Sequence, residues 1–376
     1  MSEQMHQLYA TDKDIFDLLA SAKQKLTEGV LRELARERGI FYSPQATRDD
    51  LVDALSLLPY TLNELLDVMD RRETSRRSEK TTTLTLDADI PLDELKAVVL
   101  EYQDEVGATE KVDSHQKGAN ALVMNVAYDD IDYSRTRLIQ RQRQDATIEF
   151  TQRDGKTVVR LPASDKSKRV VENLTNRIES RRKAPVARES IELDADFTAE
   201  ERTTFFTRLM SELAGHKLNG VTNLRICPSK SADDADDAAD LDEDERAAAE
   251  REMLVVVRSM ALSGENLIAS AEYQGLKSRG FFITSITWKA AQTSIPYDIP
   301  HLHAEFDDAE NGKGFKYSVK GAFRFQEGFY TKTVRPVDDT ERENLWLLIE
   351  GTARRILSDM RGKRSPAPSS ATEKIP

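Results

Sequence analysis

The sequence predicts an α+β protein, in which a small helical N-terminal module precedes two duplicated β-α-β(4)-α halves with antiparallel sheets. A near repeat supports the duplication, because residues 84–89 read LTLDAD and residues 191–196 read IELDAD. Each copy is a short alternating strand that runs into an amphipathic helix. Both segments then continue through further strands and a hairpin to a closing helix, so a helix-covered antiparallel sheet is expected in each half.

Changes in composition along the chain mark the expected domain boundaries. The segment from Arg71 to Lys80 contains no apolar residue and is typical of a linker. Residues 231–252 carry eleven acidic side chains against two arginines, which is typical of a solvated loop. The predicted organisation is a helical module over 1–70, a linker over 71–80, a first half over 81–185, a second half over 186–362 with an acidic insertion at 231–252, and a disordered tail over 363–376.

The overall composition excludes several classes of protein. The 376 residues are 39% hydrophobic, which is enough to fill the cores of two to three domains. No run of about 18 apolar residues occurs, so no membrane span is expected. The single cysteine, Cys227, cannot form an internal disulfide, which favours a reducing compartment and a cytoplasmic location. The net charge of −12 argues against a protein that coats nucleic acid with its whole surface.

Helical spacing and capping signals define the N-terminal module. Gly39 stands where a left-handed residue would end a helix, and Thr47 with Asp50 three residues later forms a capping-box pattern. An extended segment, Ile40–Pro44, separates the helices on either side of it. The expected helices lie near Asp12–Gln24, Thr27–Arg38, Thr47–Leu58 and Thr61–Arg72.

The central part of this module resembles the SAP-type helix–extension–helix motif. The matching positions are Val30, Leu34, Arg38-Gly39-Ile40, Ser43 and the segment from Arg48 to Leu51-Val52. The resemblance implies DNA binding, with Arg38 and Arg48 as contacts. A protein-docking or purely structural helical cap is the alternative, since residues 1–80 hold twelve Lys and Arg against fifteen Asp and Glu.

Strand patterns fill both halves. In the first half, Asp154-Gly155 is a strong hairpin signal, and a helix is expected from Ser164. The expected strands there include Ala121–Tyr128, Tyr133–Arg143, Thr147–Gln152 and Thr157–Leu161. In the second half they are Ile191–Leu193, Thr222–Pro228, Met253–Met260, Gly280–Lys289, His301–Asp307, Phe315–Val319 and Ala322–Tyr330, with helices from the N-cap Thr198 and over Asp338–Met360. This order resembles the TATA-binding-protein-like and helix-grip folds at the level of topology.

The sharpest candidate site is a row of arginines, Arg135, Arg137, Arg141 and Arg143. If Tyr133–Arg143 is a strand, its period of two places all four on one face. Residues 131–185 contain fourteen Lys and Arg against seven Asp and Glu. Guanidinium groups suit phosphate and carboxylate partners, so this face is expected to bind a polyanion. The alternative is an exposed face that pairs with neighbouring acids such as Glu149.

No catalytic motif stands out, and neither a cofactor nor a metal site is predicted. His301 and His303 alternate with Glu305 and Asp307, which makes them weak candidates for metal ligands, although a polar strand face explains the same pattern. The sequence therefore predicts a non-enzymatic recognition protein that binds nucleic acid or another polyanionic ligand. One alternative is a protein-interaction or sensor subunit of a multicomponent bacterial system, such as phage defence. A third is a small-molecule or lipid carrier.

Overall fold

A computed structural model describes residues 10–72, 80–136, 138, 140–195, 197–228, 275, 278 and 280–364. The acidic insertion, the strand expected over Met253–Met260 and residues 365–376 of the predicted tail lie outside these residues. The chain divides into two compact units. Unit 1 comprises Met1–Arg76, Leu100–Ser114 and Met124–Ala146, and unit 2 comprises Arg77–Val99, His115–Val123 and Thr147–Pro376.

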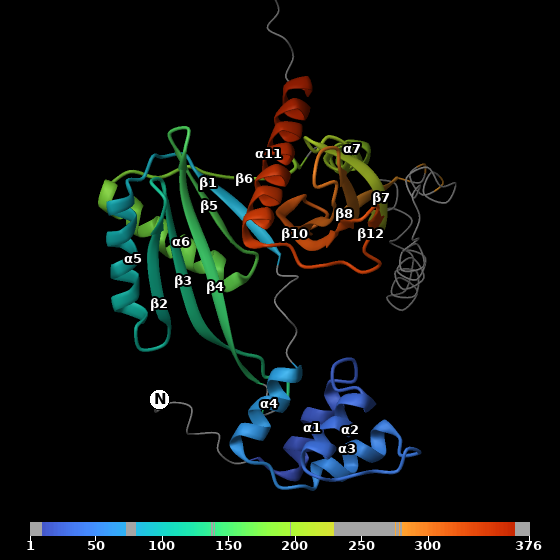
Figure 1. The fold of residues 1–376 in the computed structure, drawn as a ribbon. Coiled ribbons are helices and arrows are strands. Elements are labelled where there is room, and N and C mark those ends of the chain that lie inside the picture. The colour runs from blue at the N-terminus through green and yellow to red at the C-terminus, as the bar shows by residue number, and fades with distance from the viewer. Residues whose placement is uncertain are drawn as a thin grey trace, which may run out of the picture. The chain divides into compact units, whose positions relative to one another are not determined.

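The predicted α+β class with antiparallel sheets is confirmed (Figure 1). The helices are α1 Asp12–Ser21, α2 Glu28–Glu37, α3 Arg48–Ser56, α4 Leu62–Arg72, α5 Leu92–Val106, α6 Asp165–Arg182, α7 Ala199–Ser211 and α11 Asp339–Arg364. The strands are β1 Thr81–Leu86, β2 Lys111–Lys117, β3 Ala121–Ile131, β4 Arg141–Arg153, β5 Lys156–Pro162, β6 Arg188–Ser190, β7 His216–Pro228, β8 Phe281–Gln292, β9 Ile299–Asp308, β10 Lys313–Phe323, β11 Phe325–Gln326 and β12 Phe329–Tyr330. None of these helices is both long and apolar enough to cross a membrane.

One ten-stranded sheet contains most of the strands, in the order β2-β3-β4-β5-β1-β10-β9-β8-β7, while β6 pairs with β1. The contact between β1 and β10 is short, with Thr81 opposite Tyr317. Beyond it, β1 pairs with β6 from Leu84 opposite Ser190 to Leu86 opposite Arg188. The centre of the sheet is therefore a point where β1 changes partner.

Unit 1 is built around the N-terminal helices. Capping boxes begin α1 and α3, in which Thr11 pairs with Asp14 and Thr47 with Asp50. Gly39 takes a φ of 72° just after α2, as its predicted role requires. The apolar stripes of these helices form one buried cluster, and Leu138, from the segment between β3 and β4, packs into it.

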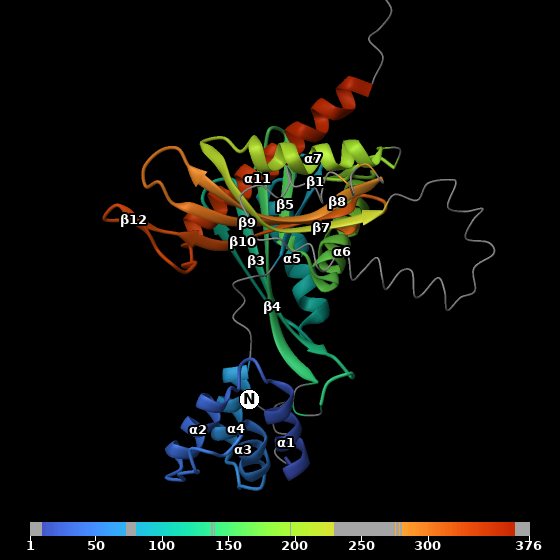
Figure 2. The same cartoon turned by 90° about the vertical axis from the view of Figure 1, so that its right-hand side faces the viewer.

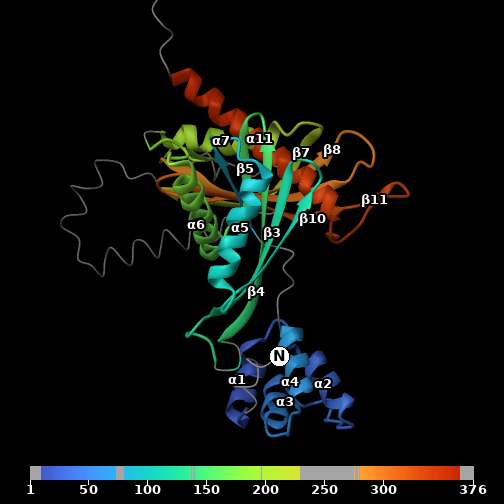
Figure 3. The ribbon, with the colours of Figure 1, turned by 90° about the vertical axis from the view of Figure 1, so that its left-hand side faces the viewer.

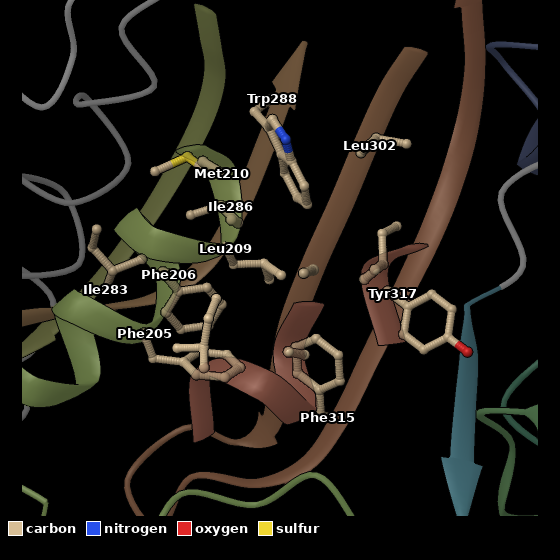
Figure 4. Packing of buried hydrophobic residues seen from close by; sticks show 14 of the residues in the cluster. Phe205, Phe206, Leu209, Met210, Ile283, Ile286, Trp288, Leu302, Phe315 and Tyr317 are labelled. Carbon is tan, nitrogen blue, oxygen red and sulfur yellow. The ribbon is translucent and has the colours of Figure 1, made fainter. Parts of the chain in front are cut away.

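The second half, 186–362, has a core rich in aromatic side chains (Figure 4). Phe205 and Phe206 of α7 pack edge-on at 5.5 Å between ring centroids, and Phe306 lies 5.6 Å from each. Edge-on and tilted aromatic contacts of this kind add to the free energy of area burial. In Figure 4 the hydroxyl of Tyr317 is directed away from the other labelled side chains.

Helices α6 and α11 lie on opposite faces of the sheet (Figures 2 and 3). Lys316 and Tyr317 are neighbours on β10, so their side chains point to opposite faces. Lys316 binds Asp307, which also binds Lys168 of α6. Tyr317 instead donates to Glu350 of α11. One face of β10 is therefore turned toward α6 and the other is covered by α11.

Three strand predictions were wrong in part. The strand expected over Tyr133–Arg143 begins only at Arg141, because Asp132 accepts hydrogen bonds from the backbone and hydroxyl of Ser134 and turns the chain there. Ile191–Leu193 is not a regular strand, although Leu193 N–H donates to Gly312 C=O. Ala322–Tyr330 is broken into the end of β10 and the β11–β12 hairpin, which turns at Glu327 and Gly328, both with positive φ.

Candidate functional site

A groove of about 1090 Å³ lies in unit 2 between α11 and the sheet face formed by β1, β4 and β5. Helix α11 turns one stripe of side chains toward it, since the lining positions recur every three or four residues. This stripe consists of Glu343, Leu347, Glu350, Gly351, Arg354, Ser358 and Arg361. The opposite stripe of the same helix, with Leu345, Ile349 and Ile356, is buried in the core of the second half.

Buried ion pairs join the groove's sheet face to α11. The Arg160 guanidinium donates to both carboxylate oxygens of Glu350, at 2.8 and 3.1 Å, and to Glu149 at 3.0 Å. Burial disfavours the charged form of Arg160, but the hydrogen bonds and charge of Glu350 outweigh it and raise the pKa of Arg160 above its ordinary value. Burial, reinforced by the Glu350 charge, raises the pKa of Tyr317, which donates to the same carboxylate.

Lys117 adds a second link between sheet and helix. Its Nζ lies 2.5 Å from Glu343 Oε1 on α11 and 3.2 Å from Glu149 Oε1 on β4. Burial opposes its charge, yet the hydrogen bonds to Glu343 and Glu149 raise the pKa of Lys117. The groups at this end of the groove therefore satisfy one another.

Two other polar groups of the groove are not satisfied in this way. Among the described residues no carboxylate pairs with Arg354, whose contact is a long hydrogen bond of 3.5 Å to Thr83 Oγ1. Thr85, on the same face of β1, is 5% exposed and lines the groove, and its hydroxyl has no partner within the described structure. Buried polar groups normally have a hydrogen-bond partner from the protein or from ordered water. Within the described residues, Arg354 therefore lacks an acidic partner and the Thr85 hydroxyl lacks a hydrogen-bond partner.

The charges of the lining residues nearly cancel, with six cations against five acids. Lys156 pairs with Asp87 at 3.0 Å, and Arg361 pairs with Asp194 at 2.8 Å. Arg153 lies 3.5 Å from Asp154. Among the lining cations, Arg354 is thus the one left without an acidic partner in the part of the chain that the structure describes.

The walls of the groove are aliphatic. Their apolar side chains are Ala121, Val158, Ile191, Leu347 and Leu357, and none of the described lining residues is aromatic. Gly351 faces open space, because a Cβ built there would meet no atom within 4 Å. Within the described structure, the site thus combines aliphatic walls with one guanidinium that has no acidic partner.

The arginine row expected from the sequence is not assembled on one strand. Arg135 lies in the turn after β3 and pairs with Asp132 at 2.7 Å, while Arg141 pairs with Asp129 at 2.9 Å. Arg141 and Arg143 are exposed on β4, with the half-buried Gln142 between them. Arg137 lies outside the described residues. Arg143 lines a smaller, polar cavity of about 390 Å³ with Tyr128 and Asp129.

Both arginines expected to contact DNA, Arg38 and Arg48, are engaged within unit 1. Arg48 donates to the carbonyl oxygens of Leu26 and Leu19, at 3.1 and 2.7 Å. Arg38 stacks over the ring of Tyr60 and pairs with Glu64 at 2.9 Å. The helix–extension–helix order of α2 and α3 matches the prediction, but these two side chains hold the module together.

Among the described residues, no group of three or more His, Cys, Asp or Glu side chains is arranged to hold a metal ion, so neither His301 nor His303 belongs to such a group. Thr287 Oγ1 and His303 Nδ1 lie 2.9 Å apart, and His303 Nε2 is 3.0 Å from Glu305 Oε2. Glu305 also binds Lys80 and Lys316. We call Lys80, Thr287, His303, Glu305 and Lys316 the His303 cluster.

Charge balance explains the ionisation of this cluster. Burial opposes a charge on Glu305, but hydrogen bonds from His303 and Lys80 outweigh it and hold the pKa of Glu305 well below its ordinary value. Burial, aided by Lys320 and Lys289, lowers the pKa of His301 to about 4, and its Nε2 lies 2.9 Å from Thr222 Oγ1. His301 is thus held neutral as part of the polar sheet face.

Sequence reasoning missed the groove and Arg354. The signal was the closing helix itself, which carries a polar stripe through Glu343, Glu350 and Arg354 opposite its apolar stripe. A polar stripe usually faces water, so only the tertiary structure reveals that this one faces a sheet. Compared with known proteins, the chain matches no family model, and no curated protein matches it.

Proposed function

We propose that this is a non-enzymatic recognition protein that binds an anionic ligand in the groove between α11 and the sheet. The observation that carries the proposal is the Arg354 guanidinium, which lines the groove without an acidic partner among the described residues. A guanidinium in a partly buried site gains most from a planar anion that accepts two parallel hydrogen bonds. Arg354 is the anchor in this proposal.

The unpartnered hydroxyl of Thr85 supports the same site. The hydroxyl is buried and lies two residues along β1 from Thr83, which bonds Arg354, and a buried hydroxyl normally has a hydrogen-bond partner. The volume of about 1090 Å³ is near the upper end of ordinary ligand pockets, so the groove has room for a metabolite or a short peptide segment.

Binding of nucleic acid remains a second candidate function. The exposed side chains of Arg141 and Arg143 favour it, and the SAP-like order of α2 and α3 is in keeping with it. The ion pairs of Arg135 and Arg141 with Asp132 and Asp129 weaken its electrostatic basis. A steep fall of affinity with salt on duplex DNA, single-stranded DNA or RNA would support this function.

A protein-interaction role is supported by exposed apolar side chains on unit 1, which include Phe41, Leu57, Leu62 and Leu66. We also propose that the two halves are copies of one unit. In both, a helix is followed by four strands in meander order, β2-β3-β4-β5 and β7-β8-β9-β10, and then by a second helix. The single cysteine is the reason to propose a cytoplasmic location.

A ligand screen with matched variants tests the groove. The wild-type protein is titrated with inorganic phosphate, ATP, aliphatic carboxylates, duplex DNA and RNA, and thermal shift and calorimetry report binding. Arg354→Gln should lower the affinity for the anion by about 10- to 100-fold, since a charge-assisted hydrogen bond is worth about 1.5–3 kcal/mol.

Arg355→Gln is the control, because Arg355 is the next residue of α11 but pairs with Glu212 outside the groove. It makes the same change of charge and should leave affinity unchanged. If no anion binds, or if both variants lose affinity equally, the groove is not the recognition site.

A further inference from the structure

We infer that the groove takes a carboxylate that carries an aliphatic group, either a free acid or the C-terminal residue of a peptide. This inference rests on the proposed function and names its ligand class. It is drawn from the charge of the lining, the chemistry of the walls and the space beside Arg354.

The charge of the lining selects a single negative charge. Of the six lining cations, Lys117, Arg160, Lys156 and Arg361 are each held by a carboxylate at 3.0 Å or less. A polyphosphate would have to break such pairs, and each broken pair would leave a carboxylate facing the ligand. Arg354 is the one lining guanidinium without an acidic partner among the described residues, and it matches one carboxylate, which can accept two parallel N–H bonds from it.

The walls select an aliphatic partner over a nucleobase. Proteins that bind bases commonly stack them on aromatic rings, and no described lining residue of the groove is aromatic. Val158 and Thr85 of the sheet face Leu347 and Leu357 of α11 across the groove, with Ile191 also in the lining. Such side chains gain free energy by covering an aliphatic group, at roughly 25 cal/mol per Å² removed from water.

Gly351 provides the place for that group. It precedes Arg354 by three residues on α11 and therefore lies on the same helix face, one turn away. A Cβ at this position would meet no atom within 4 Å, so the backbone of α11 is open to the groove beside the anchor. The aliphatic group is expected over Gly351, with the carboxylate on Arg354.

Calorimetry on the full-length protein tests the inference with defined probes. These are octanoate, a short acetylated peptide that ends in Leu-Leu with a free carboxylate, the same peptide as its C-terminal amide, inorganic phosphate and ATP. We expect octanoate, the free-carboxylate peptide or both to bind, and the amide to bind at least tenfold more weakly than its free acid. Binding of octanoate alone would identify a small acid as the source, and binding of the peptide alone would identify a chain terminus.

Substitutions at Gly351 locate the aliphatic group. Gly351→Phe should reduce carboxylate binding at least tenfold by filling the space, whereas Gly351→Ala should bind as the wild type does. Gly351→Leu serves in place of Gly351→Phe if circular dichroism shows that the phenylalanine variant is unfolded.

The outcomes separate this inference from the function on which it rests. Binding of phosphate or ATP that depends on Arg354, without binding of either carboxylate, would overturn the inference and leave an anion-binding groove. Carboxylate binding that is unchanged in Gly351→Phe and Gly351→Leu would also overturn it. If no anion binds, the proposed function fails as well.

Discussion

The groove and the His303 cluster are two polar faces of the same sheet, built from the same kinds of residue. In the His303 cluster, Glu305 is bound by His303, Lys80 and Lys316, and His303 is bound on both ring nitrogens. In the groove, no ion pair among the described residues includes Arg354, and the Thr85 hydroxyl has no hydrogen-bond partner there. Residue type alone therefore does not mark a binding site. What distinguishes the groove is that Arg354 has no acidic partner, and the Thr85 hydroxyl no hydrogen-bond partner, among the described residues.

The largest contrast is expected between Glu305→Ala and Arg354→Ala. Loss of Glu305 leaves two lysines and a histidine without their buried carboxylate, which should lower the free energy of unfolding by about 3–5 kcal/mol. Arg354 has no acidic partner among the described residues, so its replacement should change stability by no more than about 0.5 kcal/mol. Urea denaturation measures both, and equal losses would show that the two faces do not differ in this way.

The protein should lose stability in acid through His301, which neighbours the His303 cluster on β9. The pKa of His301 is lowered to about 4 by burial first and then by Lys320, Lys289 and His303, whereas in the unfolded chain it is near 6.5. The unfolded state therefore binds the proton more readily. Stability should be greatest above pH 6.5 and fall as the pH drops toward 4, by at most about 3 kcal/mol from this residue.

His301→Gln isolates that contribution from other titrating groups. The variant should lose less stability than the wild type between pH 6.5 and 4, as measured by urea denaturation at a series of pH values. Parallel curves for the two proteins would contradict the assignment.

The smallest expected effect comes from a pair of matched threonine substitutions. Thr287→Val removes a hydroxyl that lies 2.9 Å from His303 Nδ1 and should cost about 1–2 kcal/mol. Thr85→Val removes a hydroxyl with no partner within the described structure, so it should be neutral or slightly stabilising. Thermal unfolding of the two variants side by side is the measurement. A large loss of stability in Thr85→Val would show that the Thr85 hydroxyl has a hydrogen-bond partner in the folded protein.

Local signals in the sequence predicted local structure well. The capping box at Thr47, the N-cap Thr198, the left-handed Gly39 and the Asp154-Gly155 turn all occur as expected, because each depends on a few neighbouring residues. The arginine row failed where Asp132 turns the chain, since a side chain that captures the backbone of Ser134 overrides an alternating pattern.

The groove depends on distant parts of the chain and could not be predicted in the same way. Arg160 and Glu350 are 190 residues apart, and either alone is typical of a solvated surface. Only when β5 and α11 meet does Arg354 stand out as the cation that finds no acid among the described residues. The predictions for the acidic insertion fall outside the described residues and stay predictions.

Helix α11 has one stripe in the core of the second half and another in the groove, so its stability should depend on whether a ligand occupies the groove. Any molecule that binds only the folded groove adds its binding free energy to the stability of the elements that form it, about 2.7 kcal/mol when present at 100 times its dissociation constant. Amide hydrogen exchange along α11 should slow by a matching factor. A mixture of metabolites can therefore be screened for a ligand by the slowing of amide hydrogen exchange in α11, with no label attached to the metabolites.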